Sequence, residues 1–368
     1  MQICNTYNFL VKNQKFTIKN TSQVGITFLF IINNNNNNNN KQKENMNNFK
    51  KIGMTALAAS LVSTSVFAGE VTVAGSASMA VDNYSSTQKN GSKGFSMGNQ
   101  LTFTGGGELD NGLTVGISFV IDQGDNADTT AGLAEAPFDS HSVSISSDSM
   151  GKLTMHGEGG SSAQAAIDTT AAGDIWDNFD GTTTGTTVSS STSGSDILVY
   201  TLPSMVDSLA VTASYSPQQT GSESSTAYAM TYTGVEGLSA SFGVGDAKTG
   251  VSTTEADATT MKASYAYGSF TLAYSNNDYQ TAVASSDQET TSYKVSYTVS
   301  DALSITYGTE TIDKEGSTVD AEFEKITAAY TSGGMTFTVT QQSATDALHT
   351  ATTAEDQDYW SLGLAFAF

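Results

Sequence analysis

Apolar and polar side chains alternate along most of the chain after residue 69, which is the pattern of extended strands with two different faces. The last ten residues, YWSLGLAFAF, are the clearest example. Trp360, Phe366 and Phe368 share one face with two leucines, and small or weakly polar residues occupy the other. A membrane β-barrel requires such alternation, because one face of each strand contacts lipid and the other faces the lumen. A strand of a soluble sandwich could show it too.

Sixteen segments of this kind lie between residues 70 and 368, most of them close to ten residues long. Short turns alternate with longer polar loops between them. An even strand number, these lengths and this alternation are features of bacterial outer-membrane barrels. The sequence therefore predicts an all-β fold, a 16-stranded antiparallel transmembrane β-barrel over 69–368. The expected strands are 70–83, 97–106, 112–122, 140–147, 151–158, 196–202, 208–216, 225–233, 237–245, 258–267, 269–277, 289–299, 302–311, 320–330, 334–342 and 358–368.

Tyrosines are concentrated on the outward phase of these strands and near their ends. Rings at both bilayer interfaces would form the aromatic girdles of a membrane barrel, although strands favour tyrosine in any case. The residues concerned are Tyr215, Tyr228, Tyr232, Tyr265, Tyr267, Tyr293, Tyr297, Tyr307 and Tyr330.

The segment 46–68, MNNFKKIGMTALAASLVSTSVFA, has the layout of a secretory signal peptide. Lys50 and Lys51 precede an apolar stretch, and small residues lead up to a cleavage site between Ala68 and Gly69. The apolar stretch is short for a transmembrane helix, which is the alternative interpretation. The sequence thus predicts export.

Residues 1–45 do not fit in front of a signal peptide. They include an uninterrupted run of asparagines at 33–40, and such low-complexity tracts do not build a packed core. We interpret this segment as a doubtful leader upstream of the true start at Met46. An unusual disordered leader is the alternative.

The exported part would be strongly acidic and free of thiols. The only cysteine, Cys4, precedes the signal, and the chain contains no arginine. After Ala68, eight lysines stand against 36 acidic residues, which gives a net charge near −28. Nucleic-acid binding is excluded, because phosphates require clustered lysine and arginine. In a pore this acidity would attract cations, although it can also serve solubility alone.

Chemistry other than transport has little support in the sequence. His156, one of three histidines, stands in neither a nucleophile elbow nor the H-E-x-x-H spacing of a zinc site, so no enzyme is predicted. Asp174, Asp177 and Asp180 could supply oxygen ligands to Ca²⁺. Their spacing of three is unlike that of an EF-hand, however, and we expect no cofactor and no metal site.

The chain resembles the Gram-negative general porins of the alphaproteobacterial type. The signal peptide, the hairpin ELDNGLTVGISF at 108–119, the segment GKLTMHGE at 151–158, the segment LVYTLPSMVDSLAV at 198–211 and the terminal Phe368 carry this resemblance, which covers residues 69–368. It implies a homotrimer in outer-membrane lipid. It also implies that the closing aromatic strand is the signal read by the barrel-assembly machinery. The residues concerned are Trp360, Phe366 and Phe368.

The same resemblance implies a constriction formed by the third long loop, 159–195, folded into the barrel. In the family, acidic residues of this loop face a basic cluster, mostly arginine, on the opposing wall. This chain lacks arginine, but four lysines and one histidine fall on the lumen phase of their strands. The candidate constriction residues are Asp168, Asp174, Asp177 and Asp180 of the loop, with Lys152, His156, Lys262, Lys294 and Lys325 of the wall.

Together these features predict an outer-membrane porin, a water-filled channel for passive diffusion of ions and small hydrophilic solutes that prefers cations. A substrate-selective pore for cations, amines or neutral nutrients is a variant of this hypothesis. A secreted or surface-layer acidic β protein without channel activity is the alternative from another class, since acidity, hydroxyl-rich strands and missing cysteines are ordinary there too.

Overall fold

The computed structural model describes residues 6–11, 14–19, 70–85, 94–122, 138–179, 187–219, 223–248, 255–283, 286–349 and 356–368. The chain divides into two units, 1–53 and 54–368. In the first, β1 (Thr6–Val11) and β2 (Gln14–Lys19) pair as an antiparallel hairpin that the sequence analysis did not predict. Apolar residues alternate in 14–19, and aromatic and β-branched residues are frequent in both six-residue runs, which is enough to favour a local hairpin.

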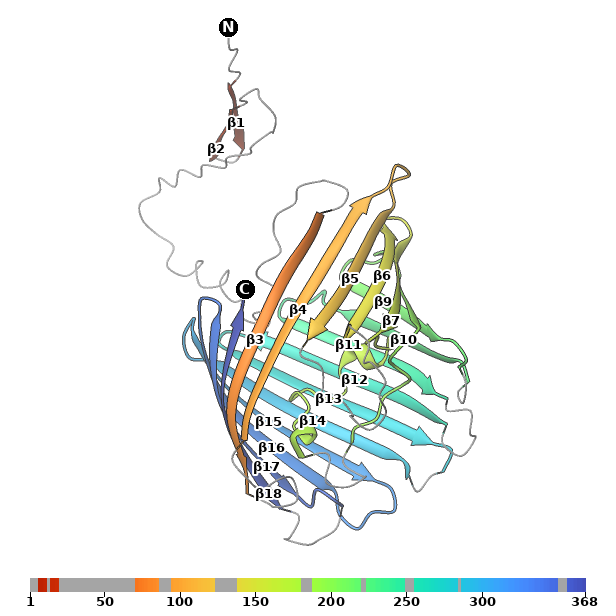
Figure 1. Cartoon of the computed structure of the whole chain (residues 1–368), viewed down its shortest axis with the longest axis vertical. Helices are drawn as coiled ribbons and strands as arrows, with labels where there is room; N and C mark the ends of the chain where they lie inside the picture. Colours follow the sequence, from red (N-terminus) through yellow and green to blue (C-terminus); the bar gives the residue numbers. More distant parts are fainter. Residues whose placement is uncertain are drawn as a thin grey trace. The chain divides into compact units, whose positions relative to one another are not determined.

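The second unit is a closed barrel of sixteen antiparallel strands, β3 to β18, in which β18 pairs with β3 (Figure 1). Consecutive strands are neighbours throughout. Closure pairs every edge, so a barrel can span a bilayer without unsatisfied backbone groups. The strands are β3 (Glu70–Tyr84), β4 (Gly94–Glu108), β5 (Thr114–Asp122), β6 (Ser140–Ser147), β7 (Gly151–Glu158), β8 (Ile197–Thr201), β9 (Leu209–Ser216), β10 (Ser225–Tyr232), β11 (Leu238–Ala247), β12 (Ala256–Tyr267), β13 (Phe270–Thr281), β14 (Gln288–Thr298), β15 (Leu303–Lys314), β16 (Ala321–Ser332), β17 (Met335–Thr345) and β18 (Gln357–Ala367).

The predicted strand number, order and positions are confirmed. The main differences are at the long-loop ends, where β13 continues to Thr281 and β15 to Lys314, several residues beyond the predicted limits. The outward positions of these extensions are polar, namely Asp278, Gln280 and Asp313, so the apolar alternation that marks a lipid-facing strand stops before the backbone ladder does. Hydrogen bonding between neighbours carries the sheet past the end of the alternation.

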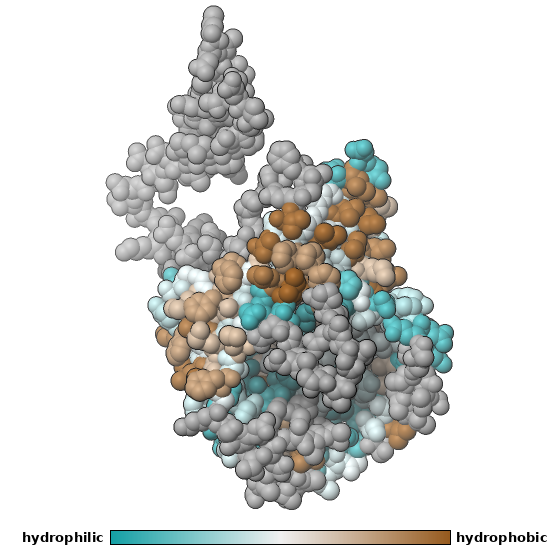
Figure 2. All heavy atoms as spheres, in the orientation of Figure 1, coloured by the Kyte–Doolittle hydropathy of each residue, from teal (hydrophilic) through white to brown (hydrophobic). Residues whose placement is uncertain are grey.

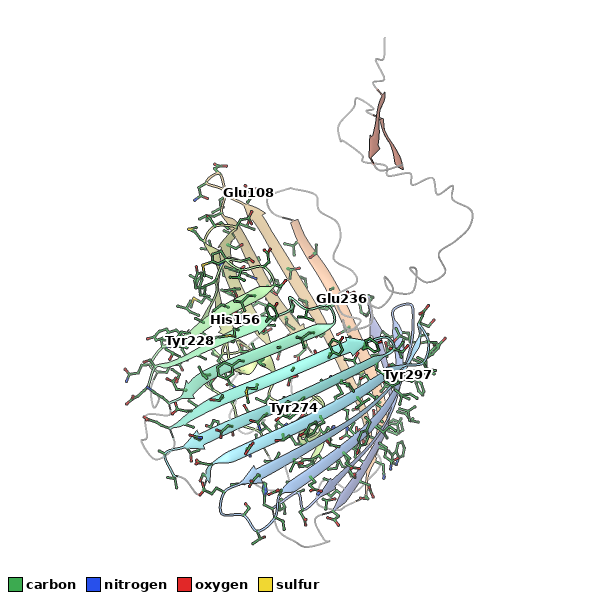
Figure 3. All side chains as sticks on the ribbon, turned by 180° about the vertical axis from the view of Figure 1, so that it is seen from behind. Glu108, His156, Tyr228, Glu236, Tyr274 and Tyr297 are labelled. Atoms are coloured by element: carbon green, nitrogen blue, oxygen red, sulfur yellow. The ribbon has the colours of Figure 1, made fainter. Side chains whose placement is uncertain are left out.

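The two faces of the barrel differ as predicted. Large apolar side chains are exposed on the outward phase of the strands, and Figure 2 shows hydrophobic side chains gathered on the outer surface. All nine tyrosines assigned to the outward phase are exposed. Tyr228, Tyr274 and Tyr297 can be followed on the outer side of the strands in Figure 3, and the Tyr274 and Tyr293 rings lie 5.1 Å apart. Among the described residues, no helix is long and apolar enough to cross a membrane.

The carboxyl-terminal residue completes the closure. Phe368 donates its N–H to the Gly75 carbonyl (3.0 Å) and accepts the Gly75 N–H (2.7 Å). A Cβ placed on Gly75 would collide with the Phe368 ring, so the ring lies directly over this glycine. The ring is 74% exposed and therefore available to lipid.

The barrel has a small apolar core on its inner side rather than between two layers. Ile175 and Phe179 of the loop between β7 and β8 pack there with Ile312 of β15, Phe323 of β16 and Ala344 of β17. The core therefore joins a loop to the wall, and it determines where the loop lies.

Candidate channel constriction

The loop between β7 and β8 lies against the inner wall, as predicted. Two short 3-10 turns, η4 (Ala165–Ile167) and η5 (Trp176–Phe179), are its only helical elements among the described residues. Its described parts, 159–179 and 187–195, hydrogen-bond to inward-facing side chains of strands from β9 to β17. This long arc of contacts fixes the loop to one side of the lumen.

Gln164 anchors the first half of the loop and is fully buried. Its side-chain nitrogen donates to the Thr260 hydroxyl (2.5 Å), and its side-chain oxygen accepts the Ser191 N–H (2.7 Å) from the returning arm of the loop. Asn277 of β13 joins this network by donating to the Ser189 carbonyl (2.9 Å). A buried amide with both of its groups satisfied holds both arms of the loop against β12 and β13.

Glycines in the strands allow the loop backbone to come close to the wall. A Cβ on Gly308 of β15 would lie 2.7 Å from the Ala172 Cβ, and one on Gly243 of β11 would lie 2.6 Å from the Ile167 side chain. A glycine inside a strand often marks such an approach. The missing side chains at these two positions therefore leave the space that Ala172 and Ile167 of the loop occupy.

Glu310 of β15 holds the second half of the loop. Its side chain is 1% exposed, and its Oε2 accepts the backbone N–H of Trp176 (3.1 Å) at the start of η5. The Phe179 ring, at the end of η5, contacts the Phe323 ring with a centroid separation of 5.9 Å. One polar and one apolar contact thus fix η5 to β15 and β16.

Two of the predicted lysines contact the loop from the wall beneath it. Lys262 Nζ of β12 donates to Asp168 Oδ2 (2.5 Å) and to the Thr170 carbonyl (3.0 Å). Lys325 Nζ of β16 donates to the Gly173 carbonyl (3.2 Å). These two cations therefore position loop backbone as well as adding charge to the lumen.

The third lysine on this wall, Lys294, lies on β14 between the other two. Gly308 is the register partner of both Lys294 and Lys325, so the two lysines lie on either side of the glycine against which Ala172 packs. Lys294 interacts electrostatically with Lys262, Asp168 and Lys325. The three lysines form one basic row under the loop.

The three described aspartates of the loop are exposed, unlike its packed apolar residues. Asp168, Asp174 and Asp177 are exposed, whereas Ile175 and Phe179 are buried. Asp168 and Asp174 have positive φ values of 68° and 46°, a region that aspartate tolerates better than most residues. The loop thus presents carboxylates to the lumen. Asp180 lies outside the described residues.

The remaining predicted wall residues are on β7, away from this row. Lys152 is exposed next to the short turn that precedes the strand, and His156 is four residues further along. The inward phase of β3 to β6 carries mainly small and hydroxyl side chains, such as Thr72 and Thr104, whose hydroxyls lie 2.7 Å apart. Among described residues, this facing wall has no lysine. The basic row therefore lies on the same side as the loop, whereas the family resemblance implied a basic cluster opposite it.

The residues that position the loop most directly, Gln164, Glu310 and Gly308, were not singled out by the sequence analysis. Glycine inside a strand is a usable signal for Gly308, but nothing in the local pattern distinguishes Glu310 from other lumen-facing polar residues. Within the described part of the chain, no three His, Cys, Asp or Glu side chains come together as a metal site.

Sixteen antiparallel strands closed into a barrel, an apolar outer face and a loop folded against the inner wall define an outer-membrane channel protein. A model of the Gram-negative porin family matches residues 53–331. The chain belongs to this family and forms a channel for small solutes in the bacterial outer membrane. The alternative of a secreted or surface-layer β protein does not fit these findings.

Solved porin structures share the fold. The anion-selective porin from Comamonas acidovorans superposes with a TM-score of 0.60 at 16% identity, covering 82% of this chain and 100% of that one. A porin refined at 1.8 Å resolution gives 0.60 at 18% identity, with 81% and 100% covered. A mutant Rh. blastica porin gives 0.57 at 17% identity, again with 81% and 100% covered. No curated protein sequence matches the chain.

Proposed function

We propose that this porin is a cation-preferring diffusion channel whose constriction is formed by the loop between β7 and β8. The observation that carries the proposal is the polarity of that loop. Asp174 and Asp177 are exposed, and Asp168 is exposed and paired with Lys262. Lys262 and Lys325 also hold loop carbonyl groups, so these wall lysines are engaged with the loop. A lumen lined by carboxylates raises the local concentration of cations and lowers that of anions.

The test is the reversal potential of single channels in a KCl gradient, before and after changing the three aspartates together to asparagine. Asparagine also tolerates positive φ, so the loop backbone can keep its conformation. A charge about 8 Å from a permeating ion in water contributes about 0.5 kcal/mol. Removing three weakens the attraction for K⁺ by about 1.5 kcal/mol and the repulsion of Cl⁻ by about the same amount, so the K⁺ to Cl⁻ permeability ratio should fall about a hundredfold at low salt. Screening should reduce this effect at about 1 M salt.

A matched control removes three charges from the outer face of the same barrel. Asp257→Asn, Glu289→Gln and Asp313→Asn are exposed on the outward phase of β12, β14 and β15. They should leave the permeability ratio close to that of the unmodified channel. A Cl⁻-preferring unmodified channel, or an equal shift in both triple variants, would contradict the proposal.

Three further properties are proposed with this function. Residues 46–68 are removed as a signal peptide, so the outer-membrane form begins at Gly69, which amino-terminal sequencing of the purified protein checks. The assembled channel is a homotrimer, inserted by the barrel-assembly machinery through the strand that ends at Phe368. It transports passively, without catalysis or a bound cofactor.

A further inference from the structure

The first and last strands of the barrel bring two aromatic rings together on the lumen side. Tyr84 at the end of β3 is the register partner of Tyr359 on β18, and their rings lie 4.7 Å apart at 47° (Figure 1 shows the two strands side by side). Both side chains are half-buried. Tyr359 also packs against the apolar core that holds the loop, which places the pair next to the constriction.

Carboxylates approach these rings from two sides. Asp82, two residues before Tyr84, is the register partner of Ser361 and therefore lies on the same inward phase. It interacts electrostatically with both tyrosines, and Asp177 of the loop acts on Tyr84 as well. Among the described residues, the charged groups acting on Tyr84 and Tyr359 include no lysine. The pair therefore lies in a region of negative potential to which both the wall and the loop contribute.

We propose that Tyr84, Tyr359, Asp82 and Asp177 form a binding subsite for small organic ammonium ions on their way through the channel. An aromatic face attracts a cation through its quadrupole, and quaternary ammonium groups are recognised by aromatic rings. A nearby carboxylate adds attraction that does not depend on the shape of the solute. Two rings and two carboxylates at one position therefore favour a cation with an apolar body over K⁺, which has none.

This inference rests on the proposed cation preference and adds a solute class to it. The basic row of Lys262, Lys294 and Lys325 lies on β12, β14 and β16. Its nearest member, Lys325, is separated from Tyr359 by Gln342 of β17, the register partner of both. An ammonium ion that follows the seam would pass the aromatic pair and the exposed side of the loop. The subsite should be weak, because a permeating solute must also leave it.

The experiment uses choline as the probe and 3,3-dimethyl-1-butanol as its uncharged isostere. Each is added to the side of the long loops while the K⁺ current through a channel made of residues 69–368 is recorded. Choline should reduce the K⁺ current in a saturable way at millimolar concentration, and the isostere should not. Tyr84→Leu and Tyr359→Leu should each raise the half-blocking concentration about two- to fivefold, as loss of a cation–π contact would. Asp82→Asn should also raise the half-blocking concentration of choline, and the increase should be larger at low salt than at high salt.

Two control variants separate a local subsite from general lumen effects. Tyr279→Leu removes an inward tyrosine from β13, and Asp122→Asn removes an inward acid from β5. Both should leave the block by choline unchanged. Absence of block, equal block by the isostere, or equal weakening in these controls would overturn the subsite. If those results came with a normal preference for K⁺ over Cl⁻, the proposed function would stand. A preference for Cl⁻ would instead refute the proposed function itself.

Discussion

Replacing Lys262 by methionine should partly release the loop from the wall. The side chain makes two contacts with the loop, one to the Asp168 carboxylate and one to the Thr170 carbonyl. The Asp168 side chain is 48% exposed, so the ion pair is screened by water and contributes only about 0.5 kcal/mol. The hydrogen bond from a charged ammonium to a backbone carbonyl contributes about 1.5 kcal/mol. Their sum, about 2 kcal/mol, corresponds to a roughly thirtyfold increase in the detached population of this loop segment.

Thiol labelling measures that population directly. Residues 69–368 contain no cysteine, and Ala171 is 1% exposed beneath the loop surface, so Ala171→Cys introduces one protected thiol. When the loop opens and closes faster than the reagent reacts, the labelling rate is proportional to the open population. Adding Lys262→Met should therefore accelerate labelling by about an order of magnitude or more. The single-channel current should become noisier in parallel.

Lys152→Met is the matched control, because it removes an exposed lumen lysine from β7 that holds none of the described loop residues. It should leave the labelling rate unchanged. Unchanged labelling in the Lys262→Met protein would refute the reasoning that this lysine positions the loop. Equal acceleration in both variants would show that the effect comes from lumen charge rather than from the two contacts.

Two other features of the barrel give predictions of their own. Gly308→Val should displace the loop at Ala172, because the new side chain would overlap the Ala172 Cβ. We expect a loss of about 1–3 kcal/mol in stability and a lower conductance. The control Gly98→Ala meets only the Ser78 hydroxyl, so it should change neither thermal unfolding nor conductance. Deleting Phe368 removes the backbone pairing with Gly75 and the ring that covers it, so a smaller fraction should migrate as heat-modifiable folded barrel in detergent gels, whereas Phe368→Tyr should fold normally.

The barrel could be predicted in detail because its determinants are local. Each lipid-crossing strand must present an apolar side chain at every second position, so the alternation revealed where strands lie and which way they face. The outward tyrosines follow from the same rule. The prediction was less accurate at the long-loop ends of β13 and β15, since strands above the lipid need only hydrogen-bonded neighbours and no apolar face.

The position of the charges in the lumen could not be predicted in the same way. Alternation indicated that Lys262, Lys294 and Lys325 point inward, but it could not show that they lie beneath the loop rather than opposite it. That depends on which arc of the wall the loop packs against. Contacts between residues about a hundred positions apart decide this, as in the hydrogen bond from Gln164 to Thr260.

The sequence by itself thus determined the membrane barrel, its strand number and the two faces of each strand. The reason is that every strand that crosses lipid must carry an apolar side chain at each second position. Only the tertiary structure decided how the inside is arranged. It placed Glu310 under Trp176 and paired Tyr84 with Tyr359 across the seam where the first and last strands meet. The physical reason is that lumen-facing positions accept almost any polar side chain, so their roles depend on which distant residues closure of the barrel and folding of the loop bring near them.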